Sequence, residues 1–156
     1  MKAVNARQCG IDAYVAFFEN LSPGSLADIR DLVTENVRFR DPFNDVIGPD
    51  AMCNVFELVF REITGPRFRI TRVGVDGDCC LLKWTFTGQS RMRNLLIEGV
   101  SEITLDAEGR VKEHIDYWNA GEEIYEHIPV IGPLLRLIRR RIGTTKAARP
   151  RAWWYR

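Results

Sequence analysis

The sequence predicts one small α+β domain in which a bent antiparallel sheet packs against three helices. Two observations predict this fold class. Up to about residue 63, apolar residues recur mainly at helical spacing, whereas residues 68–118 alternate between apolar and polar as strands do. Helices segregated from long antiparallel strands are typical of α+β layer folds. A length of 156 residues suits a single domain with a sizeable apolar core.

The first two helices are predicted from apolar spacing and from the residues that bound them. The first covers residues 11–21 and stops at Ser22-Pro23-Gly24. The second can be capped by Ser25, with Asp28 three residues further on. Their apolar faces are formed by Ile11, Tyr14, Val15, Phe18 and Leu21 in the first helix and by Leu26, Ile29, Leu32 and Val33 in the second.

A third helix is predicted to open at Gly48-Pro49-Asp50 and to close at Gly65-Pro66. Its buried face consists of Met52, Val55, Phe56, Val59 and Ile63. A strand precedes it and ends at Pro42, and four longer strands follow it. These five strands are predicted at residues 37–41, 68–75, 79–87, 95–105 and 110–118.

Strand periodicity predicts which side chains face the core. One face of the strand at 95–105 carries Leu95, Ile97, Gly99, Ser101, Ile103 and Leu105. Ser101 is its one polar side chain, and Gly99 leaves room beside it. In the first strand, Asp41 shares a face with Val37 and Phe39, which is unusual because burying an unpaired charge is costly.

Periodicity leaves the orientation of the last strand open. One face carries His114, Asp116 and Trp118, and the other carries Ile115 and Tyr117. Either set can face the core. If Trp118 points inward, so do His114 and Asp116.

Charge divides the chain into two parts. Residues 129–156 hold eight of the 22 basic residues and none of the 21 acidic ones, which leaves the preceding part with a net charge of −7. We therefore predict a domain over residues 1–128 and a basic amphipathic helix with a tail over residues 129–156. This tail could contact an anionic membrane weakly, or it could dock on the domain or on a partner subunit. Nucleic acid is not expected as a partner, because the acidic body would repel phosphates.

The sequence contains no pattern that points to a metal or a cofactor. Two histidines without metal-ligand spacing and four scattered cysteines form no recognisable ligand set. A phosphate-binding glycine loop, a nucleophile elbow and a dinucleotide fingerprint are all missing. We therefore expect no cofactor, and any catalysis would be proton transfer, isomerisation, cyclisation or hydration. Free thiols and the lack of a signal-peptide pattern lead us to expect a cytoplasmic protein.

Several motifs, taken in order, resemble the NTF2-like superfamily, which has a cystatin-like fold. They are Tyr14-Val15-Ala16, Arg40-Asp41-Pro42, Gly48-Pro49-Asp50-Ala51 and the four-strand finish. The similarity covers roughly residues 6–118. The segment from His114 to Asn119, followed by Ile128-Pro129 and a basic helix, looks most like SnoaL-like proteins of bacteria, which are more distantly similar to ketosteroid isomerases. The resemblance implies a conical barrel with a pocket on the concave side of its sheet.

The resemblance also implies roles for individual residues. Asp41 matches the aspartate that moves a proton in ketosteroid isomerases, and Tyr14 matches the tyrosine of their oxyanion hole. Ser101 stands where that hole has a protonated aspartate. Asp41 could instead cap the turn before Pro42 or pair with a nearby arginine. Tyr14 could equally be a core tyrosine with a satisfied hydroxyl.

In SnoaL-like cyclases a pocket aspartate is the acid–base catalyst, and Asp116 is the corresponding candidate, with His114 beside it. Asp41 and Asp116 also resemble the arginine-bridged aspartate pair of limonene epoxide hydrolases. Four aromatic residues are candidates for ligand contact or for the core, namely Phe56, Trp84, Phe86 and Trp118.

Three functional hypotheses follow. The first is a cofactor-free enzyme acting on a small apolar molecule. The second is a non-catalytic protein that binds such a molecule or acts as a dimeric accessory protein, and the third is a membrane-surface protein acting through residues 129–156. We also expect a homodimer, because the outer face of the sheet would otherwise expose Val100, Ile115 and Tyr117.

Overall fold

The computed structural model describes residues 2–91 and 93–123, together with the single residues 125, 133, 137, 138 and 141. Residues 1–119 form one unit, and a second begins at residue 120. Nearly all of the predicted basic helix and tail, residues 129–156, falls outside the described residues. Among the helices that are described, none is both long and apolar enough to cross a membrane.

The helices of the first unit overlap the predicted segments, but the first begins nine residues earlier than predicted and ends two residues sooner. They are α1 (Lys2–Glu19), a 3-10 turn η1 (Leu26–Asp28) leading into α2 (Ile29–Leu32), and α3 (Pro49–Glu62). A short helix α4 (Ala120–Glu123) begins the second unit.

The predicted capping of the second helix is wrong, and the helix is shorter than expected. The Ser25 side chain makes no capping bond. Its hydroxyl instead accepts the Ser22 backbone N–H at 3.0 Å, a local bond that competes with helix capping. Val33, predicted as part of the helical stripe, is the first residue of strand β1.

Gly65 and Pro66 do not close the third helix but lie within a strand. α3 ends at Glu62, and β3 already begins at Thr64. Gly65 has φ of +60° and lies at an irregularity in the pairing of β3 with its neighbour. β3 is an edge strand, where a proline can be accommodated because its missing N–H need not bond to a neighbour.

Six strands form one sheet in the order β2-β1-β6-β5-β4-β3. Their bounds are Val33–Arg40, Asp45–Ile47, Thr64–Asp76, Cys79–Gln89, Asn94–Leu105 and Val111–Trp118, for β1 to β6 in chain order. The pairs are antiparallel except β1 and β6, which run parallel. Strand β2 was not predicted, because three residues are too few to show a period.

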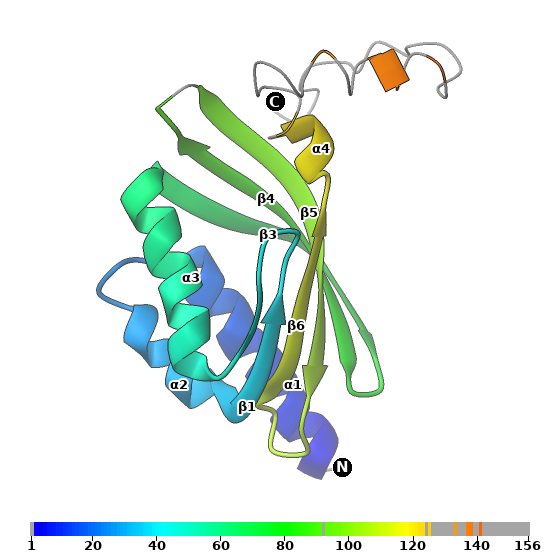
Figure 1. The fold of residues 1–156 in the computed structure, drawn as a ribbon. Coiled ribbons are helices and arrows are strands. Elements are labelled where there is room, and N and C mark those ends of the chain that lie inside the picture. Colours follow the sequence, from blue (N-terminus) through cyan, green and yellow to red (C-terminus); the bar gives the residue numbers. More distant parts are fainter. Residues whose placement is uncertain are drawn as a thin grey trace. The chain divides into compact units, whose positions relative to one another are not determined.

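The sheet is strongly bent around the helices (Figure 1). Helix α3 contacts β1 and β2 at one end of the sheet and also β3 at the other end. One helix can contact both ends only if the sheet curves around it. The main apolar core lies in this concavity. Its buried residues belong to α1, η1, α2, α3 and four strands, and include Phe18, Ile29, Phe39, Phe56, Leu82 and Ile103.

The core-facing alternation predicted for β5 is confirmed. Leu95, Ile97, Gly99, Ser101, Ile103 and Leu105 are all buried, and the residues between them are not. The open question about β6 is also answered. His114 is buried, with 3% of its surface exposed, whereas Tyr117 is 55% exposed. His114 and Asp116 therefore face the interior.

Candidate active site

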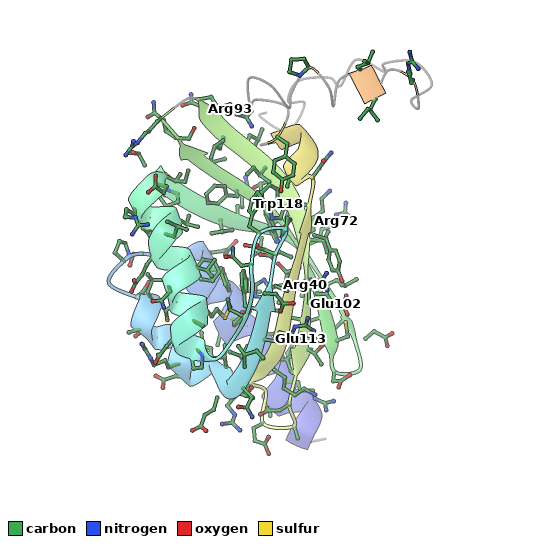
Figure 2. The ribbon with its side chains drawn as sticks, viewed as in Figure 1. Arg40, Arg72, Arg93, Glu102, Glu113 and Trp118 are labelled. Carbon is green, nitrogen blue, oxygen red and sulfur yellow. The ribbon has the colours of Figure 1, made fainter. Side chains whose placement is uncertain are left out.

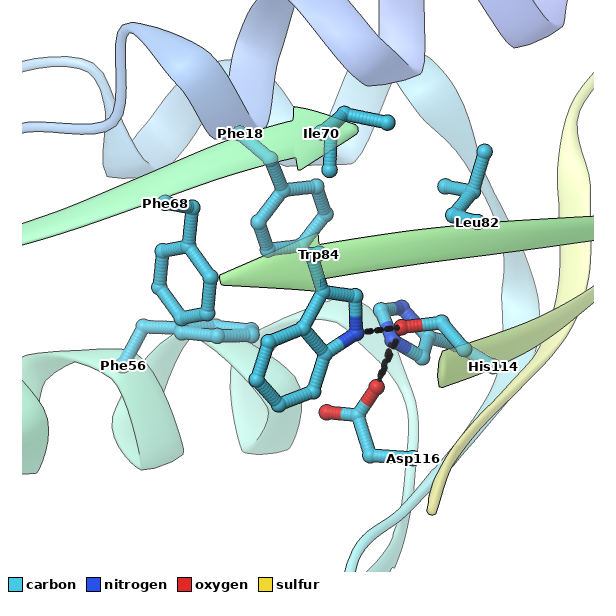
Figure 3. A pocket seen from close by; sticks show the side chains of 9 residues that line it. Phe18, Phe56, Phe68, Ile70, Leu82, Trp84, His114 and Asp116 are labelled. Atoms are coloured by element: carbon cyan, nitrogen blue, oxygen red, sulfur yellow. Dashed lines mark hydrogen bonds and ion pairs between the residues drawn. The ribbon is translucent and has the colours of Figure 1, made fainter. Parts of the chain in front are cut away.

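Four hydrogen bonds connect five polar side chains across the core; Figure 3 labels three of these side chains, Trp84, His114 and Asp116. The Trp84 indole Nε1 donates to Ser101 Oγ at 2.8 Å, and Ser101 Oγ donates to Asp116 Oδ1 at 2.5 Å. His114 Nε2 lies 2.8 Å from the same Asp116 oxygen. The Tyr14 hydroxyl lies 2.7 Å from His114 Nδ1. The Tyr14–His114 bond joins residues that are 100 positions apart in the chain.

Strand register places these side chains. Ser101 of β5 is directly opposite Asp116 of β6, and residues directly opposite on one face of an antiparallel pair are close neighbours. His114 is two residues before Asp116 and therefore lies on the same face. Trp84 of β4 is opposite Gly99. A Cβ atom at position 99 would lie 2.4 Å from Trp84 Cζ2, so the indole rests directly on the backbone of Gly99.

The chemistry of each group gives the direction of the hydrogen bonds. Indole Nε1 can only donate, so Ser101 accepts that bond and directs its own proton to Asp116. A carboxylate only accepts, so His114 donates to it from Nε2. In the neutral imidazole, Nδ1 then accepts the Tyr14 proton. The bonds from Ser101 and His114 both reach Asp116 Oδ1, and within the described part of the chain Oδ2 makes no hydrogen bond.

A small cavity lies beside this network. Its volume is about 10 Å³, roughly the room that one water molecule needs. One part of its wall is polar, formed by Ser101, His114 and Asp116. The rest is apolar and consists of Phe18, Phe56, Phe68, Ile70, Leu82 and Trp84. The aromatic rings among these meet edge to face, for example Phe68 and Trp84 with centroids 5.9 Å apart.

We predict that Tyr14 does not ionise in the folded protein. Burial, and secondarily the charge of Asp116, raises the Tyr14 pKa well above its ordinary value. A raised pKa in the folded state means that stability is fully present below about pH 10 and is lost as the pH rises further, because only the unfolded chain can ionise there. Absorbance titration near 295 nm should show phenolate from Tyr14 only together with alkaline unfolding. A Tyr14→Phe variant should show one fewer late-titrating group, and early ionisation of Tyr14 in the folded state would contradict this.

The structure brings together Tyr14, Ser101, His114 and Asp116 among the residues predicted for the site. Phe56 and Trp84 line the cavity as well. Phe86 is buried in a second apolar cluster, formed by Trp84, Phe86, Leu95 and Ile97. Trp118 packs against that second cluster and against Phe43, with ring centroids 5.5 Å apart. Tyr14 contacts His114 but is not part of the cavity wall.

Asp41 belongs to the turn after β1. Its Oδ1 accepts the backbone N–H groups of Phe43 and Asn44, both at 2.7 Å, and the Asn44 amide donates to both carboxylate oxygens at 3.0 Å. This is the turn-capping alternative that the sequence left open. Neither Asp41 nor Asp116 has an ion pair with an arginine among the described residues, so an arginine-bridged pair is not present there.

Sequence reasoning did not single out Phe18, Phe68, Ile70 and Leu82 as cavity residues. Each belongs to an ordinary apolar stripe of a helix or strand, and nothing in its spacing separates a cavity wall from core packing. The Tyr14–His114 contact was also beyond reach, since it depends on how α1 is placed against β6. Among the described residues, no group of three histidine, cysteine, aspartate or glutamate side chains is arranged to hold a metal ion.

A bent sheet over three helices, with a polar corner in an aromatic-lined cavity, places the chain among the α+β proteins whose sheet curves around its helices. The SnoaL-like domain model matches residues 14–114, more than half of the chain. The chain therefore belongs to the SnoaL-like family. A comparison with curated proteins gives no significant match.

Solved structures show the same fold. An NTF2-like protein of unknown function from Burkholderia pseudomallei has a TM-score of 0.67 at 15% identity, over 76% of this chain and 95% of that one. A Jannaschia protein named as a SnoaL-like polyketide cyclase has a TM-score of 0.65 at 14% identity, over 90% and 96%. An LEH-like epoxide hydrolase of M. tuberculosis has a TM-score of 0.60 at 15% identity, over 92% and 97%. At these identities the likeness concerns the fold.

Proposed function

We propose that this protein catalyses cofactor-free proton transfer on a small apolar molecule that carries a carbonyl group. The observation that carries the proposal is the Asp116 carboxylate. Its Oδ1 is held by Ser101 and His114, while Oδ2 has no hydrogen bond among the described residues, and the residue lines an otherwise mainly apolar cavity. A carboxylate fixed on one side and open on the other suits a general base.

In this proposal Asp116 removes a proton from the carbon beside the carbonyl, and the C–H electron pair moves into an enolate. Where the molecule has a C=C bond next to that carbon, the enolate is a dienolate, and the same carboxyl group returns the proton to the far carbon of that bond. The double bond thereby moves into conjugation with the carbonyl, which gives isomerisation. Alternatively, the enolate carbon attacks a second carbonyl of the molecule, and the proton goes to the new alkoxide, which gives cyclisation. Tyr14 acts through His114 as a positioning residue, because its hydroxyl keeps the Nε2 proton of His114 directed at Asp116.

Isomerisation or cyclisation is favoured over epoxide hydrolysis. The LEH-like neighbour raises epoxide hydrolysis as an alternative. Limonene epoxide hydrolases, which the sequence also resembles, use an arginine-bridged aspartate pair. Asp41 and Asp116 instead have separate hydrogen-bond partners, Asn44 and the backbone for the former and Ser101 and His114 for the latter.

A non-catalytic ligand-binding protein is the second candidate. The hydrogen bonds that pair Ser101 and His114 with Asp116 favour it, because a buried network of paired polar groups also stabilises a fold without doing chemistry. The two candidates share a ligand class and differ in whether the ligand is changed.

Native mass spectrometry of the protein purified gently from its source tests both candidates. We expect a co-purifying apolar carbonyl compound or its isomerised or cyclised product. Incubation of that compound with fresh protein in cofactor-free buffer should convert it. A compound that binds and stays unchanged would support the ligand-binding candidate and contradict the enzyme.

We also propose that the outer face of the sheet pairs with a second copy of the chain. An apolar patch formed by Leu81, Leu96, Val100, Ile115 and Tyr117 lies on this face, and Leu81, Leu96 and Tyr117 are about half exposed. Arginines lie on both sides of these residues, on β3 and on β1, and charged residues of β4, β5 and β6 lie between them. Figure 2 labels Arg72, Glu102 and Glu113 among them. A two-fold axis that runs between β4 and β5 would set the arginines of β3 in each copy against the acidic residues of β6 in the other.

Light scattering at micromolar concentration should therefore give a dimer mass. Leu81→Asp places a charge on the β4 side of the patch and should shift the mass to the monomer. Val75→Asp is the matched control: Val75 is equally exposed, 51% against 49% for Leu81, but it pairs with the inward-facing Cys80. A monomeric native protein, or equal effects of the two variants, would contradict this proposal.

A further inference from the structure

Trp84 fills the space in which a ligand would have to lie. Its indole is 5% exposed and rests on Gly99. With the ring in this position, the cavity holds about 10 Å³, far less than the several hundred Å³ of small-molecule pockets. A drug-sized ligand therefore cannot enter the cavity beside Asp116 unless at least one wall residue moves.

Trp84 is the wall residue whose movement would uncover the polar corner, because its Nε1 bonds to Ser101. The other buried apolar wall residues, Phe18, Phe56 and Leu82, belong to the main core. Trp84 belongs to the second apolar cluster, and its ring separates that cluster from the polar corner. Gly99 offers no side chain to hold the ring from below. One hydrogen bond, from Nε1 to Ser101, ties the indole to the polar corner, while packing on Gly99 and Phe68 holds the ring.

Displacement of the indole changes what Ser101 can accept. The Ser101 proton is directed to the Asp116 carboxylate, and a bond to a charged acceptor is stronger than one to a neutral acceptor. When Nε1 leaves, a Ser101 oxygen lone pair is left without its donor in a buried site. An unsatisfied buried acceptor is unfavourable, so a ligand that brings a donor to this point is selected over one that does not.

We propose that Trp84 is a gate that the ligand displaces, and that the ligand replaces the indole N–H with a hydroxyl donor to Ser101. The ligand class is thus a flat, apolar ring system bearing one O–H group, either a phenol or the enol form of a carbonyl compound. This inference rests on the proposed function, since it concerns the same site. It adds that the Asp116 carboxyl group can pass the removed proton to the enolate oxygen, which gives the enol. The site then binds this enol better than the ketone, and this preference favours proton removal.

The test compares 2-naphthol with naphthalene by NMR of protein labelled with ¹⁵N. The chain has four tryptophans, and the Trp84 indole N–H signal can be assigned by its loss in Trp84→Phe. We expect 2-naphthol to shift or broaden the Trp84 signal as it binds. The preference for 2-naphthol over naphthalene, measured as a ratio of dissociation constants, should fall roughly tenfold in Ser101→Ala. The difference in water solubility between the two probes is the same for both proteins, so it cancels when the ratio for Ser101→Ala is compared with the ratio for the wild type.

Trp84→Ala provides a second measurement should Ser101→Ala fail to fold. This variant opens an indole-shaped space that ends at Ser101. Indole should bind there roughly tenfold more tightly than benzofuran, which has the same shape but an ether oxygen in place of the N–H donor. Equal binding of indole and benzofuran would overturn the proposal.

The other outcomes of these experiments test the gate and the proposed function separately. Binding of 2-naphthol with an unchanged Trp84 signal, an equal preference in wild type and Ser101→Ala, or no binding of either naphthalene compound would overturn the gate. Turnover that depends on Asp116 while the Trp84 signal stays unchanged would remove the gate and keep the proposed function. If 2-naphthol binds selectively and displaces Trp84 but no ligand is turned over, the gate is supported and the proposed function is contradicted.

Discussion

Asp116→Asn should lower the turnover of the native ligand by roughly 10²–10⁴-fold, the usual contribution of a general base. The amide nearly matches the carboxylate in shape but cannot take up a proton at neutral pH. Its carbonyl oxygen can still accept from Ser101 and from His114 Nε2, so the network at Oδ1 can persist. We therefore expect kcat to fall while ligand affinity changes little. Steady-state kinetics and ligand titration on the same preparation measure the two effects separately.

Asp41→Asn is the comparison variant. The asparagine oxygen can still accept the backbone N–H groups of Phe43 and Asn44, so the turn after β1 is kept. We expect turnover within about twofold of the wild type, since its carboxylate is occupied by that turn. A large loss in Asp41→Asn together with an active Asp116→Asn would reverse the assignment of the base.

Gly10→Ala should destabilise the fold more than other small substitutions. α1 passes so close to the β5–β6 turn that a Cβ atom at position 10 would lie 1.9 Å from the carbonyl oxygen of Gly109. Both clashing atoms would be held by backbone, so the helix has to shift. We expect a loss of about 3 kcal/mol, the upper part of the range for overpacking. This corresponds to a fall in Tm of roughly 6–12 °C for a chain of this size.

Gly74→Ala is the control for Gly10→Ala. An added Cβ at Gly74 meets nothing within 4 Å. Its effect on the free energy of unfolding should stay within about 1 kcal/mol. Thermal melts of Gly10→Ala, Gly74→Ala and the wild type measure the loss of stability caused by each substitution. Equal melting temperatures for Gly10→Ala and the wild type would show that α1 does not pack on this turn.

Most of the fold was predictable because periodicity reports which face of an element is buried. The alternation in β5 placed Ser101 correctly among apolar neighbours, and the apolar stripes located α1 and α3. The errors lie where local signals compete. Ser25 looked like a helix cap, but its hydroxyl is used by Ser22. Gly65-Pro66 looked like a helix end, but an edge strand tolerates both residues.

The candidate site was predictable only in part. The resemblance to SnoaL-like proteins and ketosteroid isomerases directed attention to Tyr14, Ser101, His114 and Asp116. How these four side chains bond to one another depends on the placement of α1 against β6 and on the β5–β6 register, which periodicity does not contain. The same limit left the orientation of β6 open, since both of its faces carry residues that can be buried.

Deuterium exchange in D₂O tests the central claim most directly. Wild-type protein, without cofactor and with a metal chelator present, is incubated with a panel of apolar cyclic ketones, and ¹H NMR follows the protons beside the carbonyl. We predict that at least one ketone that binds the protein loses these protons faster than in buffer alone, and that Asp116→Asn abolishes the difference. If every ketone that binds keeps its protons at the buffer rate, Asp116 is not a proton-transfer base for this class of ligand.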